Sequence, residues 1–233
     1  MKKPRKTGSR LWREKAMKKL LNNLLDFIWP QFCLGCNREG SLCCGFCLND
    51  ILLDDLKTIS WPDKNKLYFE ACYNCCNYQD KLVQKIIKNY KYNYLENLAE
   101  LLIDILEKQA RRLNLDKNTI VVNAPLHKNK KRQRGFDQTE ILAKQLAKRL
   151  SLDYSPLLIR TKNNPAQAKL DKTARQKNVA DIFAINKKVV PNKRPNILLI
   201  DDVVTTGSTL NQASKVLKKL NYTKIVCLTI AKN

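Results

Sequence analysis

The stretch Asn196–Leu210, NILLIDDVVTTGSTL, decides the fold because it joins an apolar run, two acids and a hydroxyl-rich turn. Four apolar residues lead directly into Asp201 and Asp202. A short apolar run bounded by turn residues is typical of a strand buried in a parallel sheet. Parallel α/β sheets bind their ligands at the carboxyl ends of the strands, so we expect the two acids to lie at a ligand site.

The turn that follows, Thr-Thr-Gly-Ser-Thr at residues 205–209, predicts a phosphate site. Backbone N–H groups at a helix start, together with hydroxyls, hold a phosphate without a fixed positive charge. The two acids cannot hold a phosphate, but they suit sugar hydroxyls, a bound Mg²⁺ or a carbon that becomes cationic. The stretch therefore predicts a phosphorylated sugar as the ligand. The strand also resembles a Walker B strand, but the chain contains no G-x-x-x-x-G-K-[ST], which excludes a P-loop nucleotide hydrolase.

Strands and helices alternate along most of the chain. Strands are predicted over residues 67–76, 119–125, 156–160, 196–201 and 224–231. Two helices are predicted within 80–113, one over 138–150 with Asp137 as its cap, and one after the turn, with Leu210, Ala213, Leu217 and Leu220 facing inward. This order predicts an α/β fold with a parallel sheet and flanking helices.

The charge balance favours a polyanionic partner. The chain has 44 basic and 21 acidic residues, a net charge of +23. Residues 1–20, 127–150 and 160–178 together hold 23 basic and 4 acidic residues, so the charge is concentrated. Such concentration favours binding of nucleic acid or another polyanion. The alternative is a compositional bias that places basic residues on every surface of the protein.

The N-terminal segment, residues 1–31, predicts a basic tail followed by an amphipathic helix. Its apolar residues from Met17 to Ile28 follow one helical face, and Pro30 ends the pattern. We expect this face to pack on protein, with peripheral membrane contact as the alternative. No apolar run approaches the ~20 residues of a membrane span, and the segment makes a poor signal peptide, so we expect a cytoplasmic protein.

Cysteine spacing predicts a zinc module over residues 32–56. Cys33 and Cys36 form one C-x-x-C pair, and Cys44 and Cys47 form a second. Two such pairs this close suit a structural Zn²⁺ with four thiolates; Cys43 could replace Cys44 but breaks the spacing. Four further cysteines are expected to be packing residues: Cys72, Cys75, Cys76 and Cys227.

A basic loop follows the predicted strand 119–125 and is expected at the same sheet edge as the acids. Its cations are Lys128, Lys130, Lys131, Arg132 and Arg134. We expect one or more of them, with Arg134 foremost, to contact an anion there. The single histidine, His127, is expected to be incidental, and Phe136 is a weak candidate for stacking on nucleic-acid bases.

LLIDDVVTTGSTL resembles the ribose-phosphate motif of type I phosphoribosyltransferases. The resemblance implies that Asp201 and Asp202 contact the ribose hydroxyls of phosphoribosyl pyrophosphate (PRPP) and act in catalysis. It implies that the 5′-phosphate and ribose are held by the segment that includes Val203, Thr205, Thr206, Gly207, Ser208 and Thr209. It further implies that the basic loop receives the pyrophosphate and that Mg²⁺ accompanies PRPP.

A zinc module before such a domain, here residues 67–233, resembles the ComF family of competence-associated proteins. The marks are DFIWPQFCLGC, RGFDQTEILA, RTKNNPAQ and ARQKNVADIF. The resemblance implies a role in bacterial DNA uptake with single-stranded DNA and competence DNA-translocation proteins as partners. Asp137 stands where the family usually has Asn, and the KYNY segment lacks the glycine that often follows the family's K-Y-x.

Two functional hypotheses remain open. The first is a binding protein that holds single-stranded DNA, with the PRPP site as a sensor or relic. The second is an active transferase that moves the phosphoribosyl group of PRPP to an amine or nucleobase. The sequence contains no well-marked general base, so the acceptor of the second hypothesis stays undefined.

Overall fold

The computed structural model describes residues 30–51, 53–55, 58–61, 67–93, 96–162, 182–191 and 195–233. The predicted basic tail and amphipathic helix lie outside these residues, as does most of the basic segment 160–178. The chain divides into two compact units, residues 1–50 and 51–233, which are described separately. Within the described residues, no helix has the length and apolarity that crossing a membrane requires.

The first unit contains a tight cysteine-bearing turn. A bridge between Phe32 and Glu39 closes the turn, and the Asn37 N–H donates to the Cys33 carbonyl at 2.9 Å. Asn37 adopts a left-handed conformation with φ of 60°. The short helix α2 (Gly45–Asn49) follows, so each C-x-x-C pair lies in a turn that brings its two sulfurs together.

The second unit is built on a sheet of five parallel strands, which confirms the predicted parallel sheet. The predicted strand 156–160 is not part of it, because residues 158–160 pair antiparallel with residues 183–185 instead. In spatial order the strands of the sheet are β1 (Ala71–Asn77), β7 (Ile225–Lys232), β6 (Asn196–Val204), β2 (Thr119–Asn123) and β3 (Asp153–Tyr154). The strand with the two acids runs three residues beyond its predicted end. The reason is that its ladder with β7 continues as far as the pair Val204 and Lys232.

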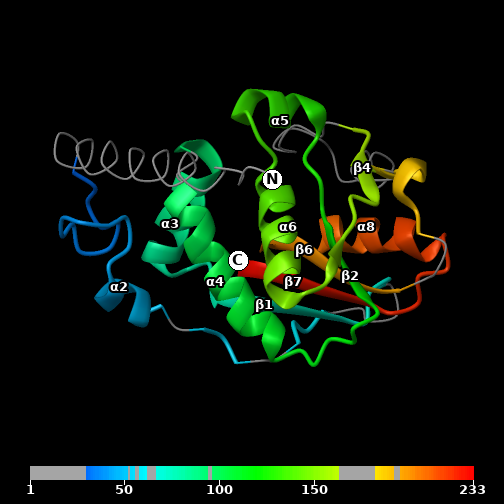
Figure 1. The fold of residues 1–233 in the computed structure, drawn as a ribbon, viewed down its shortest axis with the longest axis horizontal. Helices are drawn as coiled ribbons and strands as arrows, with labels where there is room; N and C mark the ends of the chain where they lie inside the picture. The colour runs from blue at the N-terminus through cyan, green and yellow to red at the C-terminus, as the bar shows by residue number, and fades with distance from the viewer. Residues whose placement is uncertain are drawn as a thin grey trace, which may run out of the picture. The chain divides into compact units, whose positions relative to one another are not determined.

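Both faces of the sheet are covered. The helices α4 (Glu96–Arg111) and α6 (Gln138–Leu150) pack on one face, and α3 (Lys81–Asn93) packs on α4 (Figure 1). The core of the other face includes residues of α8 (Ser208–Lys218) and of the antiparallel pair β4 (Leu158–Arg160) and β5 (Phe183–Ile185). A short 3-10 helix, η2 (Lys187–Val189), follows β5. Ile197 and Leu199 of β6 join this core, while the alternate residues point to the opposite face, which explains the unbroken apolar run.

The segment predicted as a basic loop is instead largely helical. Helix α5 spans Lys128–Arg134 between β2 and α6. His127 caps its start by accepting the Asn129 N–H at 3.2 Å, and Gly135 ends it with φ of +82°. Lysine and arginine are good helix formers, so a cap and a left-handed glycine suffice to form two turns.

The sheet reverses its winding between β6 and β2. From β6 the chain passes through α8 to its neighbour β7, and from β2 it passes through α5 and α6 to its neighbour β3 on the other side. Connections that diverge in this way leave a crevice at the carboxyl ends of the two strands. The acids of β6 and the helix α5 that follows β2 therefore lie at the same edge of the sheet.

Candidate functional site

The two acids of β6 lie side by side but in different surroundings. Asp202 is 9% exposed, and its Oδ2 forms an ion pair with Lys91 Nζ at 3.0 Å and accepts a hydrogen bond from Gln138 Nε2 at 3.2 Å. Asp201 is half-buried, and its Oδ1 accepts the Asp202 backbone N–H at 2.9 Å. Burial, with the charge of Asp202 beside it, raises the pKa of Asp201 to about 8. The pair therefore holds one carboxylate bound to a cation and one carboxyl that keeps its proton near neutral pH.

Lys91 and Gln138 are site residues that the sequence analysis missed. Lys91 lies in the last turn of α3 and Gln138 in the first turn of α6, so both are far in the sequence from the acids of β6. The two helices are joined there, because the Tyr90 hydroxyl donates to the Gln138 carbonyl at 3.1 Å. In the sequence, Lys91 lay in the family's K-Y-x pattern and Gln138 in the family mark RGFDQTEILA, but neither pattern assigned them a role at the acids.

Further cations border the acids. Lys130 of α5 is half-buried: burial lowers its pKa, the positive charges of Arg160, Arg134 and Lys91 lower it further, and Asp202 opposes them. Arg160 of β4 is also half-buried and interacts electrostatically with Asp201. Cations from three separate elements therefore meet around two carboxyls. Arg160 was predicted as part of a family motif and not as a ligand.

The turn after β6 has the backbone that the sequence predicted. Gly207 has φ of +71° and caps α8, so Ser208 and Thr209 stand in the first turn of that helix. The Trp61 ring lies against the turn: a Cβ on Gly207 would fall 2.5 Å from the ring atom Cη2. Glycine is therefore required by conformation and by space, and the packing of Trp61 is a feature that the sequence did not indicate.

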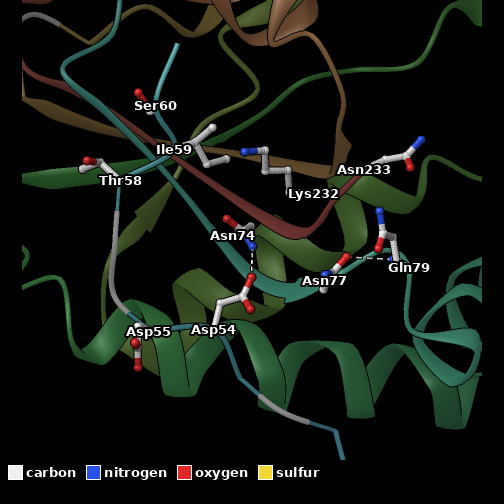
Figure 2. A pocket seen from close by; sticks show the side chains of 10 residues that line it. All are labelled: Asp54, Asp55, Thr58, Ile59, Ser60, Asn74, Asn77, Gln79, Lys232 and Asn233. Carbon is white, nitrogen blue, oxygen red and sulfur yellow. Dashed lines mark hydrogen bonds between the residues drawn. The ribbon is translucent and has the colours of Figure 1, made fainter.

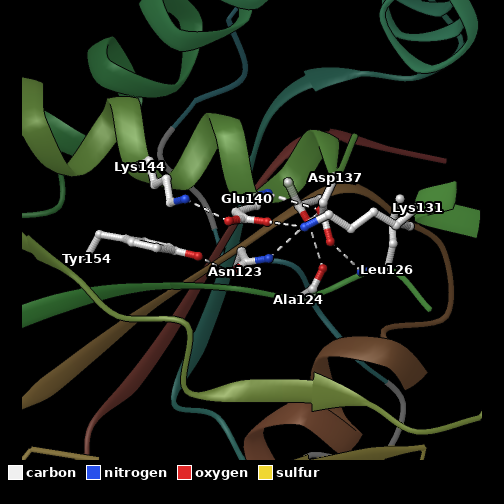
Figure 3. A network of polar contacts seen from close by, with 9 residues as sticks. Asn123, Ala124, Leu126, Lys131, Asp137, Glu140, Lys144 and Tyr154 are labelled. Atoms are coloured by element: carbon white, nitrogen blue, oxygen red, sulfur yellow. Dashed lines mark hydrogen bonds and ion pairs between the residues drawn. The ribbon is translucent and has the colours of Figure 1, made fainter. Parts of the chain in front are cut away.

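Asp137 fixes the junction between α5 and α6 (Figure 3). Its carboxylate accepts the backbone N–H groups of Leu126 at 2.8 Å and Glu140 at 3.1 Å, and the Thr139 hydroxyl donates to it at 2.8 Å. Lys131 pairs with Glu140 at 2.8 Å. The predicted capping role of Asp137 is confirmed, and Lys131 is held by an acid of α6.

The other predicted residues of the basic segment have different positions. Lys128 and Arg132 are exposed on α5, while the Arg134 guanidinium lies over the Tyr92 ring. The Phe136 ring packs 6.0 Å from the buried Tyr90 ring, so it is a packing residue rather than a free platform for bases.

In the first unit the four predicted cysteines converge. The Sγ atoms of Cys33, Cys36, Cys44 and Cys47 all lie within 4.8 Å of one another. Four thiolates around a tetrahedral Zn²⁺ have sulfurs about 3.8 Å apart, so the cluster can hold that ion. Although burial raises it, backbone N–H groups lower the pKa of Cys33 to about 6 overall, which favours the thiolate that a metal needs. Cys43 is not one of the four, which resolves the alternative that the spacing left.

The remaining cysteines are packing residues, as expected. Cys72, Cys75 and Cys76 of β1 and Cys227 of β7 are all buried. Cys72 and Cys227 are paired in the register of the two strands and belong to one core cluster.

A separate cavity of about 480 Å³ lies beside β1 and the end of β7 (Figure 2). The residues lining it are Asp54, Asp55, Thr58, Ile59, Ser60, Asn74, Asn77, Gln79, Lys232 and Asn233. Burial raises the pKa of Asp54, whose carboxylate accepts a hydrogen bond from Asn74. The cavity contains none of the predicted site residues, so its chemistry is distinct from that of the acids on β6.

Comparisons with known proteins connect the chain to competence proteins, although no family model matches it. The chain is 26% identical over 214 residues to Competence protein F of Haemophilus influenzae, covering 83% of this chain and 86% of that protein. It is 35% identical over 102 residues to Competence protein ComFC of Bacillus subtilis, covering 44% and 39%. It is 29% identical over 118 residues to DNA utilization protein YhgH of Escherichia coli, covering half of each chain.

Solved structures show weaker likeness. The allosteric regulatory enzyme of purine biosynthesis is 14% identical, with a TM-score of 0.43 over 61% of this chain and 30% of that chain. An adenine phosphoribosyltransferase is 18% identical, with a TM-score of 0.35 over 59% and 72%. The competence proteins of Haemophilus influenzae and Bacillus subtilis confirm the resemblance to ComF proteins that the sequence motifs indicated.

Proposed function

From this resemblance to ComF proteins we propose that the chain binds PRPP with Mg²⁺ at the carboxyl end of β6 and handles single-stranded DNA during DNA uptake. The observation that carries the proposal is the meeting of Lys91, Lys130 and Arg160 around Asp201 and Asp202. PRPP has hydroxyls for the acids and two phosphate-bearing ends for the cations and the turn. The names of the curated relatives, competence and DNA utilization proteins, support the DNA part.

The roles follow the chemistry of each group. Asp201 and Asp202 receive the ribose hydroxyls, and the turn 205–209 surrounds the 5′-phosphate with hydroxyls and backbone N–H groups. The pyrophosphate lies toward the cations of α3, α5 and β4, with Mg²⁺ offsetting its charge. Gln138 supports this assignment: its Oε1 atom is buried without a hydrogen-bond partner among the described residues, and a sugar hydroxyl is a suitable donor.

A second candidate function is transfer of the phosphoribosyl group. In that reaction the anomeric C–O bond breaks, pyrophosphate leaves with the electron pair, and a nitrogen lone pair forms the new C–N bond. The carboxylate of Asp202 stabilises positive charge on the sugar, and the cations stabilise the leaving group. The nitrogen must then lose a proton, and no neutral base is evident beside the acids in the described residues, because His127 accepts a hydrogen bond as a helix cap. Transfer therefore needs an acceptor with an acidic N–H or ammonia itself.

Calorimetric titration with PRPP and Mg²⁺ tests the proposal. We expect the wild type to bind and the double variant Asp201→Asn/Asp202→Asn to lose most of that affinity. Asp153→Asn, an exposed acid on β3 at the far side of the sheet, is the matched control and should bind as the wild type does. Absence of binding by the wild type would refute the PRPP site.

A coupled assay for pyrophosphate separates the two functions. Release of pyrophosphate on addition of ammonia, an amine donor or a nucleobase identifies a transferase. Binding of PRPP without release in any of these reactions favours a binding protein. None of the nine cysteines forms a disulfide in the described residues, which supports the further proposal that the protein acts in the reducing cytoplasm. Competence DNA-translocation proteins are the proposed partners.

A further inference from the structure

An exposed aromatic ring stands beside the candidate PRPP site. Tyr92, in the last turn of α3, is 71% exposed, whereas Tyr90 two residues earlier is fully buried. The residue between them is Lys91, whose Nζ reaches Asp202 at 3.0 Å. The guanidinium carbon of Arg134 lies 5.2 Å from the centroid of the Tyr92 ring. Helix α3 therefore presents a solvent-facing ring next to the residue that contacts the acids.

Buried contacts hold both members of this pair in place. The Tyr90 hydroxyl donates to the Gln138 carbonyl at 3.1 Å, and the Tyr90 ring packs against Phe136 at 6.0 Å. Tyr90 thus anchors the helix turn that carries Tyr92, and Phe136 anchors the chain two residues after Arg134. The ring and the guanidinium are consequently preorganised, which lowers the entropy that ordering them on a ligand would cost.

The pairing of the ring with Arg134 does little for the fold, since most of the ring remains in water. An exposed aromatic ring with an arginine beside it has the chemistry that recognises a nucleobase: a flat π-face for stacking and a cation for the electron-rich heterocycle. The neighbouring Lys130 and Lys91 supply the positive field that a phosphate-bearing ligand requires.

We propose that Tyr92 and Arg134 form a stacking platform for a nucleobase at the mouth of the site on β6. The proposal rests on the proposed function, because it places the base next to a ribose-phosphate site. The ligand is a planar nitrogen heterocycle. It is either a free base that approaches bound ribose phosphate or a base of single-stranded DNA, and the arms of the experiment distinguish these two sources.

The experiment compares Tyr92→Ala, Tyr92→Phe and a control, Tyr68→Ala. Tyr68 is also exposed and has a lysine beside it, with Lys215 Nζ 5.7 Å from its ring centroid. Each protein is titrated with a (dT)20 oligonucleotide and with an abasic oligonucleotide of equal length, by fluorescence anisotropy at one salt concentration. Each is also titrated with adenine, guanine and uracil in the presence of ribose 5-phosphate and Mg²⁺, and with PRPP and Mg²⁺, by calorimetry.

We expect Tyr92→Ala to weaken binding of (dT)20 or of a free base about 5- to 100-fold, as loss of one stacked base does. Tyr92→Phe keeps the ring and should bind as the wild type does, and Tyr68→Ala should too. Binding of the abasic oligonucleotide and of PRPP should not change. A loss confined to (dT)20 identifies a DNA base, and a loss confined to free bases identifies an acceptor base.

Three results would overturn the platform. The first is equal binding of all base-containing ligands by Tyr92→Ala and the wild type. The second is an equal loss in Tyr68→Ala, and the third is a wild type that binds no base in either form. The PRPP titration reports separately on the proposed function: a wild type that binds PRPP but shows any of these results keeps the PRPP site and loses the platform.

Discussion

At the residue scale, the site depends on two neighbouring acids that the fold places in different environments. Asp202 has a cationic partner in Lys91, while Asp201 has the carboxylate of Asp202 as its neighbour and is half-buried. Two adjacent acids in water would both be ionised at neutral pH. Here the raised pKa of Asp201 means that the folded protein carries a proton that the unfolded chain releases.

The first prediction concerns the pH dependence of stability. Because the pKa of Asp201 is higher in the folded than in the unfolded chain, ionisation opposes folding, and the penalty grows as pH rises from about 4 to about 8. Asp201→Asn removes this penalty. The free energy of unfolding of the variant, relative to the wild type, should therefore increase by a few kcal/mol over that range. Urea denaturation at several pH values measures it, and a constant difference between the two proteins would contradict it.

The second prediction concerns Lys91. Lys91→Gln removes a cation that touches Asp202, and it should weaken PRPP·Mg²⁺ binding at least 10-fold if that cation meets the pyrophosphate, since hydrogen bonds to charged groups contribute about 1.5–3 kcal/mol. Lys88→Gln, an exposed lysine on the same helix, is the control for lost charge and should change affinity less than twofold. Calorimetry distinguishes a specific contact of Lys91 with the ligand from a general effect of lost charge. Equal effects of the two variants would assign Lys91 a general electrostatic role only.

The acids and the turn were predictable because strand, charge and turn chemistry all lie within fifteen residues. Lys91, Gln138 and Trp61 were not, since their roles depend on which helix ends and loops the sheet brings to one edge. A single sequence carries no information on that pairing beyond local patterns. The cysteine cluster is the intermediate case: spacing predicted its members, and the structure brought the four sulfurs together.

At the element scale, the junction between α5 and α6 combines a wrong prediction with a confirmed one. The segment predicted as a loop is the helix α5, whereas the predicted cap Asp137 does begin α6. A run of five cations within seven residues predicts a solvent-exposed loop, yet two turns of helix form between the caps His127 and Gly135. The predicted anchor, Asp137, is correct and carries more than one contact. It accepts from two backbone N–H groups and a hydroxyl, and it is 4% exposed.

The third prediction tests this anchor. Asp137→Ala removes a helix cap and leaves buried donors without partners, which should lower the free energy of unfolding by about 2–3 kcal/mol. Asp137→Asn retains an acceptor oxygen and should cost less than half as much. Asp116→Ala, at an exposed acid that accepts the Asn118 N–H in a turn, is the control and should cost under about 1 kcal/mol. Urea denaturation gives the free energy of unfolding of all three variants. An equal loss of stability in Asp116→Ala would contradict a special role of Asp137 at the junction.

The fourth prediction concerns the zinc module as an element. We expect metal analysis to give about one zinc per chain, and Cys44→Ser to lose it, because structural zinc sites need all four ligands. Cys43→Ser changes the adjacent cysteine, which lies outside the cluster, and should retain the metal. A loss of zinc in Cys43→Ser with retention in Cys44→Ser would exchange the roles of the two residues.

At the scale of the whole molecule, charge is the property that separates nucleic-acid binding from small-molecule binding. The chain has a net charge of +23, and several described cations are engaged by acids, as Lys131 is by Glu140. Lys128 and Arg132 instead lie exposed on α5, which follows the carboxyl end of β2. Lys117 and Lys224 are exposed at the opposite edge, just before β2 and β7 begin.

The fifth prediction compares the exposed cations at the carboxyl edge of the sheet with those at the opposite edge. If single-stranded DNA lies along the carboxyl edge, its affinity should fall with salt, with a log–log slope of about −0.7 for each phosphate contact. Lys128→Gln/Arg132→Gln should make that slope less steep by about 1.4, because two contacts are lost. Lys117→Gln/Lys224→Gln removes the same charge at the other edge and should leave the slope nearly unchanged. Equal slopes for both double variants would mean that net charge alone attracts DNA, and an affinity that does not vary with salt would rule out phosphate-dominated binding.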